Sequence, residues 1–151
     1  MIFPVGITIV LTIFVLFSIG VFYFGKNRGT ALALSFYPAY LLFDKFPYLD
    51  KLIFTTNPQY LALNKTLIFF GFLFITYIII SGYIAEDFGN NRFVSTFLLG
   101  LVLTVLTLGF AHFILPVDQI YSFSPKLNLI FNNTIGFFWW ITVPLILLFF
   151  V

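Results

Sequence analysis

The chain has 151 residues, of which 62% are hydrophobic and 8% are charged, against about 45–50% and about 25% in ordinary soluble domains. A water-soluble fold of this size could not bury that much apolar surface, because the outside of a small domain must be compatible with water. The formal net charge of +2, without a run of basic residues, excludes a typical nucleic-acid-binding protein, and the absence of cysteine excludes disulfides and thiolate metal sites. No repeat or linker divides the sequence, so we expect residues 1–151 to form a single transmembrane domain.

The first predicted element is an uncharged run from Ile2 to Phe24. At about 1.5 Å of rise per residue, a helix of this length crosses a hydrocarbon core of about 30 Å with some tilt. A signal peptide carries basic residues before its apolar part, whereas Lys26 and Arg28 follow this run. We interpret the run as an uncleaved membrane anchor with the N-terminus outside and Lys26 inside.

The second apolar run, residues 30–43, has fourteen residues with Pro38 in its middle. A run of this length is more typical of a re-entrant, interfacial or buried segment than of a membrane span. Pro38 also disfavours helical backbone angles at Tyr37. Two arrangements follow: the segment turns back or kinks, which leaves four spans in the chain, or it crosses the membrane and makes five.

The basic residues distinguish these arrangements, because cytoplasmic loops carry an excess of lysine and arginine. If residues 30–43 cross, three basic residues lie on one face and four on the other, which gives no orientation. If they turn back, all except Arg92 share one face. Six against one favours four spans plus a short re-entrant or kinked segment at 30–43, with both termini outside; five spans is the alternative. The predicted inside-facing basic residues, which could also attract anionic lipid headgroups, are Lys26, Arg28, Lys45, Lys51, Lys65 and Lys126.

The remaining elements continue the membrane pattern. Apolar residues at helical spacing within 46–53 predict a short helix lying in the headgroup plane. The run from Thr66 to Ile84 predicts a span whose helix begins earlier, with Pro58 at its first position. Further spans are predicted from Phe93 to Leu115 and from Thr134 to the C-terminus. The expected fold is therefore an all-α, polytopic integral membrane bundle.

Small and hydroxyl side chains recur at steps of 4, 4, 3 and 4 residues in the run from Phe93 to Leu115. Such a seam lets helix backbones approach closely in lipid, where packing drives association. Its partner is either another helix of this chain or a helix of another subunit. The predicted helix-packing seam consists of Thr96, Gly100, Thr104, Thr107 and Ala111.

The only histidine, His112, lies near the end of the same run. Ionisable residues within membranes are candidates for proton relays or ligands, and irregular backbone at membrane depth often marks a binding site. His112 and Pro38 therefore form a candidate polar site. One histidine alone builds no metal centre, and the adjacent Glu86 and Asp87 point in different directions, so they do not form a catalytic pair. We expect no cofactor and no catalytic residue.

Two short motifs resemble the colicin V production family of small bacterial inner-membrane proteins. They are GKNRG at 25–29, after the first span, and NNRFVSTFLLG at 90–100, opening a later one. The resemblance covers residues 2–115 and implies a non-enzymatic inner-membrane protein linked to export or envelope maintenance, without catalytic residues. The family often has amphipathic C-terminal helices, whereas residues 134–151 here are apolar enough for a membrane span.

The function that fits these observations is a non-catalytic scaffold or subunit of an envelope or secretion assembly, in contact with the bilayer and with other membrane subunits or copies of itself. One alternative is a small transport or channel component with a path near Pro38 and His112. Another is an accessory subunit of a respiratory membrane complex. An enzyme is disfavoured because the sequence lacks convergent polar groups.

Overall fold

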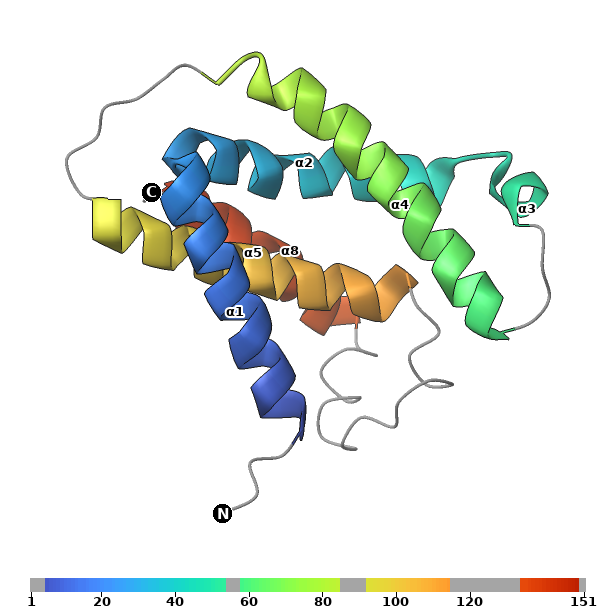
Figure 1. The fold of residues 1–151 in the computed structure, drawn as a ribbon. Coiled ribbons are helices and arrows are strands. Elements are labelled where there is room, and N and C mark those ends of the chain that lie inside the picture. Colours follow the sequence, from blue (N-terminus) through green and yellow to red (C-terminus); the bar gives the residue numbers. More distant parts are fainter. Residues whose placement is uncertain (1–4, 54–57, 85–91, 115–133, 150–151) are drawn as a thin grey trace.

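The computed structural model of the chain describes residues 5–53, 58–84, 92–114 and 134–149 (Figure 1). All regular structure in these ranges is helical, which confirms the all-α prediction. The helices are α1 (Val5–Phe24), α2 (Lys26–Lys45), α3 (Leu49–Leu52), α4 (Pro58–Ser81), α5 (Arg92–Ile114) and α8 (Thr134–Phe149).

The helix positions follow the predicted apolar runs closely. Pro58 is the first residue of α4, as expected, because the N–H that proline lacks has no helical partner at this position. Two helical stretches in the described residues, Tyr60–Ser81 and Phe93–His112, are long and apolar enough to cross a membrane by length and composition. Thr8–Phe24 and Phe138–Phe149 are shorter apolar helices. Helix length alone therefore supports two candidate spans and does not establish four.

The structure corrects the re-entrant interpretation of residues 30–43. These residues lie in one uninterrupted helix, α2, so the chain does not turn back at Pro38. An interior proline removes one backbone hydrogen bond and strains the helix, but packing by neighbouring helices can hold the helix together. That packing is extensive here, because small residues let the neighbours approach. The buried residues of α2 are Gly29, Ala31, Ala33, Ser35, Phe36, Ala39 and Phe43.

A single residue, Gly25, connects α1 to α2. Its φ of 91° and ψ of 159° lie in a region that side chains other than glycine rarely adopt. The Gly25 N–H donates to the Val21 carbonyl at 2.9 Å, and the Gly29 N–H donates to the Gly25 carbonyl at 3.2 Å. The GKNRG motif therefore encodes a sharp turn that sets the direction in which α2 begins.

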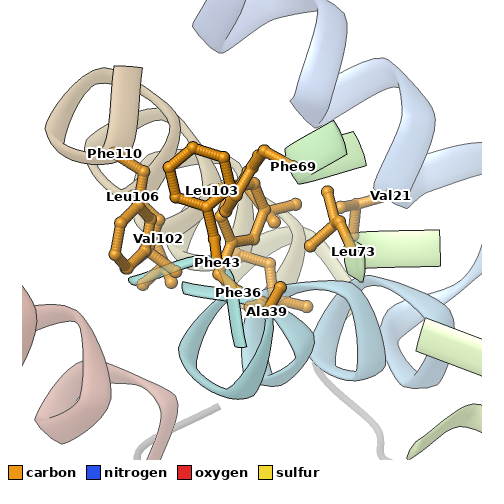
Figure 2. Packing of buried hydrophobic residues seen from close by; sticks show 12 residues of the cluster. Val21, Phe36, Ala39, Phe43, Phe69, Leu73, Val102, Leu103, Leu106 and Phe110 are labelled. Atoms are coloured by element: carbon orange, nitrogen blue, oxygen red, sulfur yellow. The ribbon is translucent and has the colours of Figure 1, made fainter. Parts of the chain in front are cut away.

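Helix α5 packs against α1, α2 and α8, and α2 packs against α4. The core between α2, α4 and α5 combines aliphatic side chains with the rings of Phe36, Phe43, Phe69 and Phe110, as Figure 2 shows. Phe36 of α2 stacks on Phe110 of α5 with ring centres 5.6 Å apart, and Phe69 of α4 lies 6.1 Å from Phe36 and 6.2 Å from Phe110. One ring from each helix thus meets the other two at the centre of the fold.

Many large apolar side chains are exposed on the outside of the fold. Leu16 of α1 is 64% exposed, and Leu67 and Phe74 of α4 are 62% and 64% exposed. Exposed apolar residues follow the length of α4 and form what we call the outer face of α4. This face consists of Tyr60, Leu63, Leu67, Phe70, Phe74, Ile75, Ile78 and Ile79.

Candidate functional site

The predicted seam on α5 is occupied by α1 at Gly100. A Cβ atom on Gly100 would lie 3.3 Å from the Ser18 Cα and would overlap the Ser18 hydroxyl. Gly100 is buried, and the Thr104 hydroxyl, also buried, donates to the Gly100 carbonyl at 2.7 Å. At this level the close approach is therefore intramolecular.

The other seam residues are less enclosed. Thr96, Thr107 and Ala111 are half-buried. The Thr107 hydroxyl oxygen is shielded from solvent without a hydrogen-bond partner among the described residues, and the same is true of the Ser18 hydroxyl. The five residues of the predicted seam thus do not form one continuous buried strip.

A second close approach on α5 was not predicted. The indole of Trp140 in α8 lies against Gly109, where a Cβ atom would overlap the ring. The indole N–H donates to the Val105 carbonyl at 3.0 Å. The sequence signal was a further glycine nine residues after Gly100, but the residue that fills the resulting notch belongs to a distant segment. Trp139, by contrast, is exposed.

Pro38 lies where α2 meets α4. The N–H that proline lacks would have bonded to the Leu34 carbonyl, four residues earlier. The next carbonyl, that of Ser35, lies 3.1 Å from the hydroxyl of Thr76 in α4. The single Thr76 proton also faces two carbonyls of its own helix, those of Phe72 at 2.9 Å and Leu73 at 3.0 Å. A neighbouring helix thus supports the turn that Pro38 weakens.

Pro144, buried within α8, has a similar environment. The carbonyl that loses its partner belongs to Trp140, and the next carbonyl is that of Ile141. The hydroxyl of Tyr37 in α2 donates to the Ile141 carbonyl at 3.0 Å. Tyr37 therefore connects the turn before Pro38 to the turn before Pro144.

His112 lies in the last turn of α5 and is half-buried. Two residues earlier, Phe110 contacts both Phe36 and Tyr40 of α2, with ring centres 5.6 and 5.0 Å apart. Aromatic rings therefore fill the space between α2 and α5 at this level. A polar path from Pro38 to His112 stays a hypothesis from the sequence.

The basic residues separate into groups at the two ends of α2. Lys26 and Arg28 lie in its first turn and Lys45 at its last residue, about 28 Å away at 1.5 Å per residue. The predicted grouping of six basic residues on one face depended on a turn at Pro38, and a continuous α2 removes that reason. Lys126 lies outside the described residues.

At the far end of α2, the basic side chains Lys45 and Lys51 are exposed. The Lys45 ammonium lies 2.8 Å from the Asp44 carboxylate, and that of Lys51 lies 5.2 Å from the ring centre of Tyr48. The Leu52 carbonyl at the end of α3 accepts a hydrogen bond from the Asn64 amide of α4 at 2.9 Å. Lys65, next in sequence, is half-buried. The predicted short helix within 46–53 is thus present and tied to α4.

Within the described residues, the structure contains no cluster of three or more histidine, cysteine, aspartate or glutamate side chains that could hold a metal ion. Its distinctive local features are instead the glycine notches of α5 and the two proline turns. Comparisons with protein-family models, with curated proteins and with solved structures find no match to this chain.

Proposed function

We propose that the chain is an integral membrane protein in which α1, α4, α5 and α8 contact lipid and α2 crosses the bilayer among them. The observation that carries this proposal is the outer face of α4. Large apolar side chains exposed along a helix of 24 residues exceed what a soluble monomer normally leaves in water. A hydrocarbon environment accounts for such a face.

We favour five crossings over four plus a hairpin. The end of α1 and the beginnings of α2 and α5 lie at the same side of the fold, at the left in Figure 1, whereas α2 ends and α4 begins at the right. This alternation is what successive crossings produce. Lysine side chains at the ends of α2 can extend to the headgroups while its apolar middle lies among other helices. The termini then lie on opposite sides of the membrane.

Exposed tyrosines at the helix ends support this arrangement. Tyr23 at the end of α1 is 82% exposed and Tyr83, just beyond α4, is 87% exposed. Tyr48 and Tyr60, at the other side of the fold, are each more than half exposed. Tyrosine is enriched at both membrane–water interfaces, because its ring is apolar and its hydroxyl is polar. The two pairs indicate the two interfacial levels.

For biochemical activity, we propose a non-catalytic subunit or scaffold of a membrane assembly. The aromatic filling of the core next to Pro38 supports packing rather than a transport path. A role in a bacterial envelope or secretion assembly, in the manner of colicin V production proteins, rests on the sequence motifs alone. Transport and an accessory role in a respiratory complex stay the alternatives.

The topology can be tested with single-cysteine variants, because the natural chain has no cysteine. Asn27→Cys, Tyr48→Cys and Tyr83→Cys would be labelled in sealed membrane vesicles with an impermeant maleimide from either side. Five crossings predict that 27 and 83 react from one side and 48 from the other. A hairpin predicts that 27 and 48 react together and 83 opposite, and that result would refute the five-crossing proposal.

The scaffold role requires a separate experiment. The full chain, expressed in its native host with an affinity tag, would be purified in mild detergent after cross-linking in the membrane. A reproducible complex with other membrane proteins is expected. A lone chain that mediates solute flux in proteoliposomes would instead favour the transport alternative.

A further inference from the structure

Pro38 and Pro144, the two prolines inside the described helices, have the same kind of polar contact nearby. In each case a hydroxyl from a neighbouring helix approaches the carbonyl three residues before the proline. For Pro144 the donor is Tyr37 and the acceptor is Ile141, at 3.0 Å. An interior proline is a common site of helix bending, because one hydrogen bond is absent there and the ring displaces the preceding turn.

We propose that Tyr37 is the latch of a proline hinge in α8: its hydrogen bond to the Ile141 carbonyl fixes the direction of the helix beyond Pro144. The hydrogen bond acts at the turn that the proline weakens. Without it, that turn lacks both the Tyr37 hydrogen bond and the backbone hydrogen bond that proline cannot donate. The segment after Pro144 is then able to change direction.

The contacts of α8 on the two sides of Pro144 fit a hinge. Before the proline, Trp140 is fixed to α5 by its close approach to Gly109 and by its hydrogen bond to the Val105 carbonyl. After the proline, Leu147 and Leu148 pack against the core, whereas Leu145, Ile146 and Phe149 are exposed. Each half of the helix thus has its own contacts with the rest of the fold, and the Tyr37 hydrogen bond acts at the turn between them.

The position of Tyr37 also depends on a contact with α4. Tyr37 immediately precedes Pro38, so the position of its phenol depends on the backbone of the proline turn in α2. That turn is supported by the Thr76 hydroxyl of α4, which lies 3.1 Å from the Ser35 carbonyl. A displacement of α4 against α2 would therefore move the turn at Pro38 and with it Tyr37. Tyr37 would in turn act on α8 through its hydrogen bond to the Ile141 carbonyl. This inference does not depend on the proposed scaffold role.

The experiment measures the direction of α8 beyond the hinge. Spin labels would be attached to Phe74→Cys on the outer face of α4 and to Ile146→Cys on α8, both exposed positions in a chain without natural cysteine. The distance distribution between the labels would be recorded by double electron–electron resonance in detergent micelles. Tyr37→Phe removes only the hydroxyl, and we expect it to broaden the distribution at least twofold or to add a second distance.

A proline variant identifies the mechanism. Pro144→Ala restores the missing N–H and removes the hinge, so Tyr37→Phe should no longer broaden the distribution in that background. The matched control is Thr142→Val, which removes a hydroxyl that donates to the Phe138 carbonyl within α8 itself, at 2.7 Å. This control should leave the distribution unchanged.

Three outcomes would overturn the latch. The distribution could stay narrow in Tyr37→Phe, or it could broaden equally with and without Pro144. The third is loss of the fold in Tyr37→Phe, judged by circular dichroism and gel filtration, because the hydrogen bond would then be a requirement for folding rather than a latch. Thr76→Val tests whether α4 acts on Tyr37 through the turn at Pro38. We then expect Thr76→Val to broaden the distance distribution less than Tyr37→Phe does, and Thr76→Ser, which keeps the hydroxyl, not to broaden it.

Discussion

The indole of Trp140 lies directly against the backbone of Gly109 and donates its N–H to the Val105 carbonyl at 3.0 Å. In the helical pattern, the Val105 carbonyl also faces the Gly109 N–H, four residues on. Only a residue without a side chain allows the ring to reach that carbonyl. One glycine therefore gives α8 both its position on α5 and its polar contact.

This relationship predicts that Gly109→Ala weakens the fold. The new methyl group would overlap the Trp140 ring, and such overpacking typically costs about 1–3 kcal/mol. Thermal unfolding in detergent, followed by circular dichroism, would show a lower midpoint. The matched control is Gly71→Ala in α4, where nothing lies within 4 Å of the added Cβ; alanine there should raise helix stability by about 0.5–1 kcal/mol. Equal effects of the two changes would contradict the proposed role of Gly109.

A second prediction concerns the turn between α1 and α2. Gly25→Ala should destabilise the fold by about 1–3 kcal/mol, because φ at this position is +91° and a side chain strains that conformation whatever space surrounds it. Gly20→Ala, five residues earlier, is the control: it lies inside α1 with nothing within 4 Å of the added Cβ and should be neutral or stabilising. If Gly25→Ala melted at the temperature of the natural chain, this turn would not constrain the packing of α2.

The sequence predicted the helices well where long apolar runs determine them. The runs that predict α1, α4, α5 and α8 are apolar on all sides and long, and each becomes a helix close to its expected bounds. The expectation of a turn at Pro38 failed, because it used only the local effect of proline on the backbone, and α2 continues through this position. Packing of α2 against α1, α4 and α5 lets the helix tolerate Pro38.

The cross-helix contacts were beyond sequence reasoning for a different reason. The pairing of Trp140 with Gly109 and of Tyr37 with Ile141 depends on the rotation of α8 about its axis, which no local pattern specifies. The seam residues were recognised by their spacing, but spacing alone could not tell which of them would meet α1. Of the five predicted seam residues, only Gly100 and Thr104 are buried.

The two buried threonine hydroxyls of α5 should respond differently to removal. The Thr107 hydroxyl has no partner among the described residues, so Thr107→Val, which preserves the shape, should be neutral or stabilising by about 1 kcal/mol. Thr104→Val removes a hydrogen bond of 2.7 Å to the Gly100 carbonyl and should be neutral or destabilising by about 0.5–1.5 kcal/mol. Melting curves of the two variants decide this, and a reversed order would indicate that Thr107 has a partner outside the described residues.

The contact between Ser18 and Gly100 separates internal packing from subunit association. Gly100→Ala places a methyl group against the Ser18 side chain and should lower the melting midpoint, because α1 must move away from α5. Ser18→Gly removes the obstructing side chain, so the double variant should recover part of the loss. Gel filtration with light scattering would show the same oligomeric size for both variants, since the notch is filled from within the chain. A change of size without a change of melting midpoint would mean instead that Gly100 meets another subunit and that the position of α1 is wrong.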